Sequence, residues 1–167
     1  MTPNSTLPPN WATGCFYGGE IQVLIDKNNP YEKFNTLIHE TYHLLYNKFI
    51  TTKYNISRIV WIDESLASNF DNTTENLIKN NEFKELVLKL LKKNPLPIMS
   101  EISFDKNNVV TKEYDGYDLF KIVGRYLIET KSNEELYTYI NDIDRVIKDG
   151  ENILEESLKY FKEKYKL

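Results

Sequence analysis

Apolar residues recur at helical spacing along most of this chain. Between Tyr31 and about Thr51 they fall at Phe34, Leu37, Ile38, Thr41 and Leu45, one face of a helix. The same spacing predicts further helices over residues 59–70, 82–93, 116–130, 133–147 and 151–165. Asn72 followed by Glu75 resembles another helix start, and residues 98–113 read as an irregular connection. The chain is therefore predicted to be mostly helical.

The first part of the chain has a different pattern. Residues 11–25 are predicted to form a β-hairpin, because Gly18-Gly19 suits a tight turn and residues 20–25 alternate as a strand does. Residues 28–30, Asn-Asn-Pro, then break the chain before the first helix. The predicted fold class is α+β: a small N-terminal hairpin packed on a pair of helices, followed by a C-terminal helical bundle.

Length and charge narrow the possible functions. The 167 residues predict a flexible arm at 1–10 and a single domain at 11–167. The net charge of -4, with no basic block, argues against nucleic-acid binding, and no apolar run approaches the roughly 18 residues of a membrane span.

The lone Cys15 and the absence of a signal-peptide pattern in residues 1–10 predict a cytoplasmic protein. Secretion stays open if the sequence begins after a removed signal, and the oligomeric state is not predicted.

The candidate chemistry lies in the first helix, at residues 39–43, His-Glu-Thr-Tyr-His. His39 and His43 are the two histidines of the chain, and residues four apart share a helix face one turn apart. Two imidazoles so placed can bind one zinc ion at roughly 2.0–2.1 Å each. Glu40 is rotated by about 100° from His39, so its carboxylate would lie beside the metal and accept a proton from the attacking water.

A catalytic zinc site usually has three protein ligands and one open position. No third histidine exists, so the third ligand must be a carboxylate or Cys15. The best candidate is Glu64, which falls on the next predicted helix within residues 61–67, Trp-Ile-Asp-Glu-Ser-Leu-Ala. The hairpin would then pack on a zinc-binding helix pair.

These segments resemble the gluzincin metallopeptidases, a group that includes thermolysin and the zinc aminopeptidases. The aminopeptidase branch has Trp-x-x-Glu-Gly-x-Ala after its His-Glu-x-x-His helix, and this chain departs from that pattern at Ser65. A later segment, residues 117–129, resembles the helix that the family begins with a transition-state tyrosine. The resemblance covers about residues 11–145 and implies a stand-alone catalytic core with one zinc ion per chain.

The resemblance also implies a role for each site residue. His39, His43 and Glu64 would bind zinc, Glu40 would be the general base and Tyr117 would stabilise the oxyanion, with Tyr114 as the alternative tyrosine. The family orients its zinc histidines through other polar groups, for which Ser68 and Asn69 are candidates. An edge strand that pairs with the peptide would place Gly19, Glu20 and Ile21 at the substrate, although an ordinary core strand explains the same pattern.

Three functions fit these observations. The leading hypothesis is a zinc peptidase that acts on peptides or unfolded protein segments. The alternative is a zinc-binding module on the same scaffold with little turnover, acting as a regulatory or protein-interaction domain, although Glu40 argues for a base. The third is a metal-free helical domain. Cys15 is either a packed side chain or a fourth ligand that holds the site latent.

Overall fold

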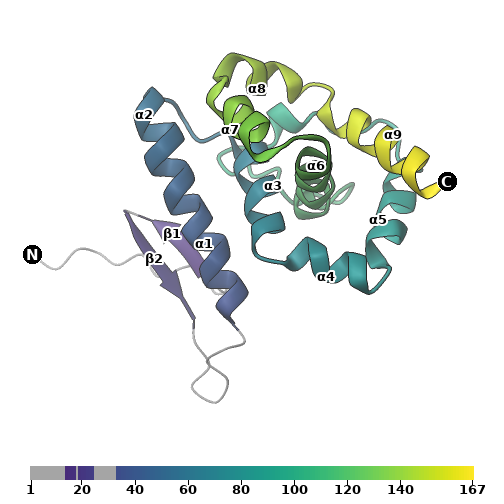
Figure 1. Ribbon diagram of the computed structural model, residues 1–167, viewed down its shortest axis with the longest axis horizontal. Helices are drawn as coiled ribbons and strands as arrows, with labels where there is room; N and C mark the ends of the chain where they lie inside the picture. Colours follow the sequence, from purple (N-terminus) through teal and green to yellow (C-terminus); the bar gives the residue numbers. More distant parts are fainter. Residues whose placement is uncertain (1–13, 18, 25–32) are drawn as a thin grey trace, which may run out of the picture.

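A β-hairpin and a set of helices make up residues 14–17, 19–24 and 33–167, which the computed structural model describes (Figure 1). Strands β1 (Gly14–Tyr17) and β2 (Glu20–Val23) pair antiparallel, with Gly14 opposite Val23 and Tyr17 opposite Glu20. Gly19 lies in the connection with a φ of 86°, a backbone conformation that favours glycine. The predicted hairpin strands are confirmed, whereas the arm at 1–10 and the chain break at 28–30 lie outside the described residues.

The first helical segment ends three residues later than predicted. Helix α1 (Phe34–Tyr46) continues without a break through a π-helical turn, η2 (Asn47–Thr51), into the short α2 (Thr52–Tyr54). Asn55 ends it in the left-handed conformation, with a φ of 51°. Asparagine tolerates that conformation better than most residues, which explains why the helix stops there.

The remaining elements follow the predicted order, except that one predicted helix is divided into two. They are α3 (Val60–Phe70), α4 (Thr73–Lys79), α5 (Glu82–Leu91), η3 (Met99–Glu101), α6 (Gly116–Thr130), α7 (Asn133–Asn141), α8 (Ile143–Asp149) and α9 (Ile153–Tyr165). The single helix predicted over 133–147 is wrong, because Asp142 leaves the helical conformation and its carboxylate accepts a hydrogen bond from the Arg145 N–H, which begins α8. The predicted helix start at Asn72 is confirmed, although its side chain makes no capping bond.

Helix α6 is the centre of the helical part. Figure 1 shows it nearly end-on, with α3, α5, α7 and α9 around it, while α1 stands beside α3 and carries the hairpin on its other side. The large side chains with almost no exposed surface come from most of these helices: Trp61, Leu66, Phe83, Leu119, Phe120, Leu127 and Phe161. Burial of this shared core fixes α3 in the middle of the molecule. The structure confirms the α+β, mostly helical class.

Helices α3 and α6 approach most closely at Gly124. A Cβ atom at this position would overlap the Ser65 carbonyl oxygen and the Asn69 side-chain amide. The absence of a side chain at Gly124 therefore lets α6 lie directly against the α3 backbone at Ser65. The same contact positions the turn of α3 that bears Glu64.

No helix in the described residues is both long enough and apolar enough to cross a lipid bilayer.

Candidate metal centre

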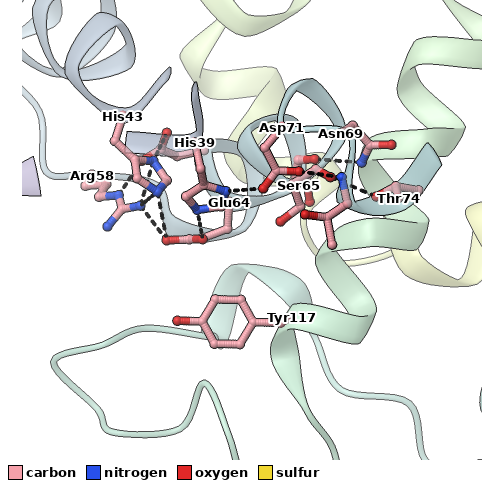
Figure 2. A network of polar contacts seen from close by, with 12 residues as sticks. His39, His43, Arg58, Glu64, Ser65, Asn69, Asp71, Thr74 and Tyr117 are labelled. Carbon is pink, nitrogen blue, oxygen red and sulfur yellow. Dashed lines mark hydrogen bonds and ion pairs between the residues drawn. The ribbon is translucent and has the colours of Figure 1, made fainter. Parts of the chain in front are cut away.

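Helix α1 brings three of the predicted site residues together. The His39 and His43 rings lie one turn apart, with centroids separated by 4.6 Å and planes at 88° to each other. His43 and Glu40 are buried, while the His39 side chain keeps 18% of its surface exposed. The two imidazoles therefore share the face of α1 that packs towards α3 (Figure 2).

Helix α3 supplies the third predicted ligand. The Glu64 carboxylate faces both rings, with Oε2 3.5 Å from His39 Nε2 and Oε1 3.5 Å from His43 Nε2. Ligand atoms of the three side chains lie within 4.8 Å of one another. Among the described residues, this is the group of histidines, cysteines and acids that could hold a metal ion, and Cys15 is not part of it.

The donor set and its spacing fit a metal ion. Two donors that each lie about 2.0–2.1 Å from a tetrahedral zinc ion are separated by roughly 3.4 Å, close to the 3.5 Å between each Nε2 and a Glu64 oxygen. Glu64 is only 3% exposed, and its Oε2 has no hydrogen-bond partner in the described chain. A buried carboxylate oxygen without a partner is costly, and a cation would relieve that cost.

Two aspartates orient the histidines from behind. His39 Nδ1 lies 2.8 Å from Asp71 Oδ2, and His43 Nδ1 lies 2.9 Å from Asp63 Oδ1. A carboxylate is only an acceptor, so both Nδ1 atoms carry a proton, which leaves Nε2 of each ring as the nitrogen that can bind a metal ion. Such carboxylate–histidine pairs fix the tautomer that a metal requires.

Sequence reasoning missed these aspartates. It proposed Ser68 and Asn69, but the Asn69 amide donates to the carbonyls of Ser65 and Lys121, and the histidines bind Asp63 and Asp71 instead. A signal was present for Asp71, because it lies seven residues after Glu64 and residues two helical turns apart share a face. Asp63, which precedes Glu64 directly, gave no such signal.

Arg58, in the loop before α3, hydrogen-bonds to both Glu64 and Asp63. Its Nη2 donates to Glu64 Oε1 at 2.6 Å, and its Nε donates to Asp63 Oδ2. Nη2 is also 3.1 Å and 3.4 Å from the two nitrogens of His43, so the guanidinium lies against the face of that ring. Sequence periodicity could not reveal Arg58, because loops carry no such pattern.

The electrostatics of the cluster follow from burial and from these contacts. Burial lowers the pKa of His39, but the nearby carboxylates of Asp71, which is hydrogen-bonded to it, and Glu64 outweigh burial and raise this pKa to about 10. Burial raises the pKa of Glu64, yet the histidines and Arg58 lower it to about 2. The pKa of Glu40 is raised by burial and, to a smaller extent, by Glu64. Glu64 is thus held as an anion, and Glu40 is the more basic carboxylate.

Tyr117 stands at the start of α6, where Asp115 accepts a hydrogen bond of 2.9 Å from its N–H. Burial and the negative charge of Glu64 raise the pKa of Tyr117 to about 12, so its phenol stays a proton donor. Figure 2 shows the ring apart from the hydrogen-bonded cluster, with no interaction drawn between them. Tyr114, the alternative, donates its hydroxyl to the Asn108 carbonyl at 2.8 Å and is therefore already engaged.

Comparisons with known proteins found no relative of this chain. No protein-family model matches the chain, and no curated protein or solved structure is significantly similar to it. The case for a function therefore depends on the geometry of this site.

The hairpin meets the site through its first strand. A Cβ atom on Gly14 would lie 2.6 Å from Thr36 Cγ2 and 3.2 Å from Glu40 Cγ, so β1 packs directly on the stem of Glu40. Gly19 and Glu20 are exposed at the hairpin turn, and Ile21 pairs with Phe16. In the described residues no hydrogen bond or ion pair joins these three to the metal cluster, and their substrate role stays a prediction.

Proposed function

We propose that this protein is a zinc-dependent peptide hydrolase of the gluzincin type. The observation that supports this most strongly is the convergence of His39, His43 and Glu64, with Glu40 next to the first histidine on the same helix turn. A purely structural zinc site closes its coordination with four protein ligands, whereas three ligands leave a position open for chemistry.

Zinc is the metal that this donor set favours. Two neutral imidazoles and one carboxylate match the ligands of catalytic zinc in known peptidases, and Mg²⁺ or Ca²⁺ would prefer oxygen donors alone. When bound, the ion would supply a Lewis acid that polarises the peptide carbonyl and makes a water molecule reactive near neutral pH. One ion per chain would also give a partner to Glu64 Oε2, which has no hydrogen bond in the described chain.

Glu40 would act as the general base. Its carboxylate is buried beside the cluster, and its raised pKa makes it a better proton acceptor than Glu64. Glu40 would take a proton from the attacking water while the water oxygen bonds to the peptide carbon. It would then deliver this proton to the amine nitrogen as the C–N bond breaks.

Tyr117 would donate a hydrogen bond to the oxygen that becomes negative when water adds to the carbonyl. Its phenol keeps its proton at neutral pH, which this role requires. The substrate would be a peptide or an unfolded protein segment, because the roles proposed for the metal ion, Glu40 and Tyr117 involve the peptide unit and no particular side chain.

The decisive test is metal-dependent cleavage. Purified protein should contain about one zinc per chain and cleave a quenched fluorescent peptide library. Glu40→Gln should bind zinc equally well but lose at least about a hundredfold in kcat, the usual contribution of a general base. Glu155→Gln, which changes an exposed glutamate on α9, is the matched control and should leave both values unchanged.

Each outcome separates one hypothesis from the others. Zinc without cleavage would favour the zinc-binding module, and no bound zinc would favour a metal-free helical domain. Cleavage that survives in Glu40→Gln would reject Glu40 as the base.

A second experiment tests the oxyanion donor. Tyr117→Phe should lower kcat by about 10²–10³-fold with zinc content unchanged, the range found when one oxyanion donor is removed. Tyr114→Phe removes a hydroxyl that bonds to the backbone at Asn108, so it should reduce stability and leave kcat unaltered. Equal kcat values for the two variants would contradict the role of Tyr117.

A further inference from the structure

A pocket of about 370 Å³ lies next to Arg58, between the loop that leads into α3 and the segment around η3. Its apolar walls come from isoleucines, and its polar lining comes from Ser57, Arg58, Trp61, Ser100, Ser103 and Lys106. This volume is within the range of pockets that bind small ligands. The polar side chains are three serine hydroxyls, one indole and two cations, and none of them is a carboxylate, which favours an anionic ligand.

The first feature of this pocket is the start of α3. Helix α3 begins at Val60, and its N-cap residue Ile59 has no side chain that can accept a hydrogen bond from the first turn. Both Ile59 and Val60 line the pocket. The unsatisfied N–H groups and the positive end of the helix dipole at this position favour an anion.

A second, independent feature is the indole of Trp61. Trp61 is one of the residues that line the pocket and is only 1% exposed, and its indole Nε1 has no hydrogen-bond partner in the described chain. Gly150 lies against this nitrogen, since a Cβ atom there would come within 2.8 Å of it and of Ser100 Cβ. A buried N–H without an acceptor is rare and destabilising, and an oxyanion would relieve that cost.

The charge of the residues that line the pocket also favours an anion. In a chain of net charge -4, the described residues that line this pocket include two cations and no carboxylate. Arg58 is already paired with Asp63 and Glu64, so Lys106 supplies the charge that is not balanced. Ser57, Ser100 and Ser103 add hydroxyl donors that adapt to carboxylate or phosphate oxygens.

We propose that this pocket is an oxyanion-binding subsite, formed by the start of α3, Trp61 and Lys106, and that it takes a carboxylate of the peptide substrate. The substrate part of this inference rests on the proposed hydrolase function. Arg58 connects the two sites, because the residue that lines the pocket also donates to Glu64. A peptide whose cleaved bond lies at the metal would therefore place a nearby acidic group in the pocket.

Binding is tested without any catalysis by following the Trp61 indole N–H resonance in ¹⁵N-labelled protein. N-acetylglutamate should shift this resonance saturably, and neutral N-acetylglutamine should not. Lys106→Met should weaken binding about fivefold, the value of one exposed charge pair, whereas the control Lys84→Met on α5 should not change it. No saturable shift, or equal shifts with both compounds, would overturn the oxyanion site.

Four matched peptides then identify the source of the carboxylate. They carry Glu or Gln beside the cleaved bond, and each is made as the free acid and as the C-terminal amide. Faster cleavage of the Glu peptides assigns a side chain, and faster cleavage of the free acids assigns the terminal carboxylate. Either preference should be lost in Lys106→Met, while equal rates for all four peptides would overturn the substrate assignment. If no peptide is cleaved, the proposed hydrolase fails while the indole titration still decides the oxyanion site.

Discussion

The aspartate behind His39 offers a sharp test of how the metal ligands are oriented. Both Asp71 oxygens accept hydrogen bonds: Oδ2 from His39 Nδ1 at 2.8 Å, and Oδ1 from the Thr73 N–H at 2.7 Å. Asparagine has a single side-chain oxygen, so in Asp71→Asn an NH₂ group must face one of these two donors. If it faces His39, the imidazole must move its proton to Nε2, the nitrogen that would bind the metal.

The magnitude follows from the same contacts. A hydrogen bond to a charged group contributes about 1.5–3 kcal/mol, and loss of a carboxylate behind a metal-bound histidine typically weakens metal binding 10–100-fold. These values agree, since 100-fold corresponds to about 2.7 kcal/mol. We therefore expect Asp71→Asn to weaken zinc binding by about 10–100-fold.

Competition with a chromophoric chelator would measure the zinc Kd, and circular dichroism would show whether the variant folds. Asp144→Asn, an exposed change at the start of α8, is the control and should keep the wild-type Kd. A folded Asp71→Asn protein whose Kd lies within twofold of wild type would refute the proposed role of Asp71.

Two further predictions concern the helical scaffold. Gly124→Ala should lower the free energy of unfolding by at least about 2 kcal/mol in a urea titration, because the added Cβ would push α6 away from α3. An unchanged midpoint of urea unfolding would show that the two helices can move apart without cost. Burial raises the pKa of Glu129, but hydrogen bonds from Lys164 and Arg125 outweigh burial and lower this pKa below 4.5. The ionised Glu129 carboxylate therefore stabilises the fold above pH 4.5, and this stabilisation is lost as the pH falls through the lowered pKa. Glu129→Gln should thus cost about 1–2 kcal/mol at pH 7, and the difference from wild type should shrink below pH 4.5, whereas Glu155→Gln should show neither effect.

The helix periods predicted most of the elements because each helix buries one continuous apolar stripe. The stripe over 116–130 corresponds to α6. The break at Asp142 was missed because apolar spacing continues across it, from Ile140 to Ile143. The Asp142 carboxylate accepts a hydrogen bond from the Arg145 N–H and caps the start of α8, and side-chain capping does not alter the apolar period.

The candidate site was predictable where its residues share one helix. The spacing of His39 and His43 needs only the geometry of α1, and the structure places Glu64 against them as expected. The contacts of Arg58 and Asp63 could not be predicted, because they depend on how the loop before α3 folds back on the cluster. The zinc ion, the base and the oxyanion donor stay predictions from geometry.

The most direct test of the metal centre is a crystal structure of zinc-loaded protein with anomalous data at the zinc edge. The account predicts one strong peak per chain, about 2.0–2.2 Å from Nε2 of His39, Nε2 of His43 and a Glu64 oxygen, with a coordination position free of protein atoms. A peak at any other place, coordination through Nδ1, or no peak at saturating zinc would contradict it.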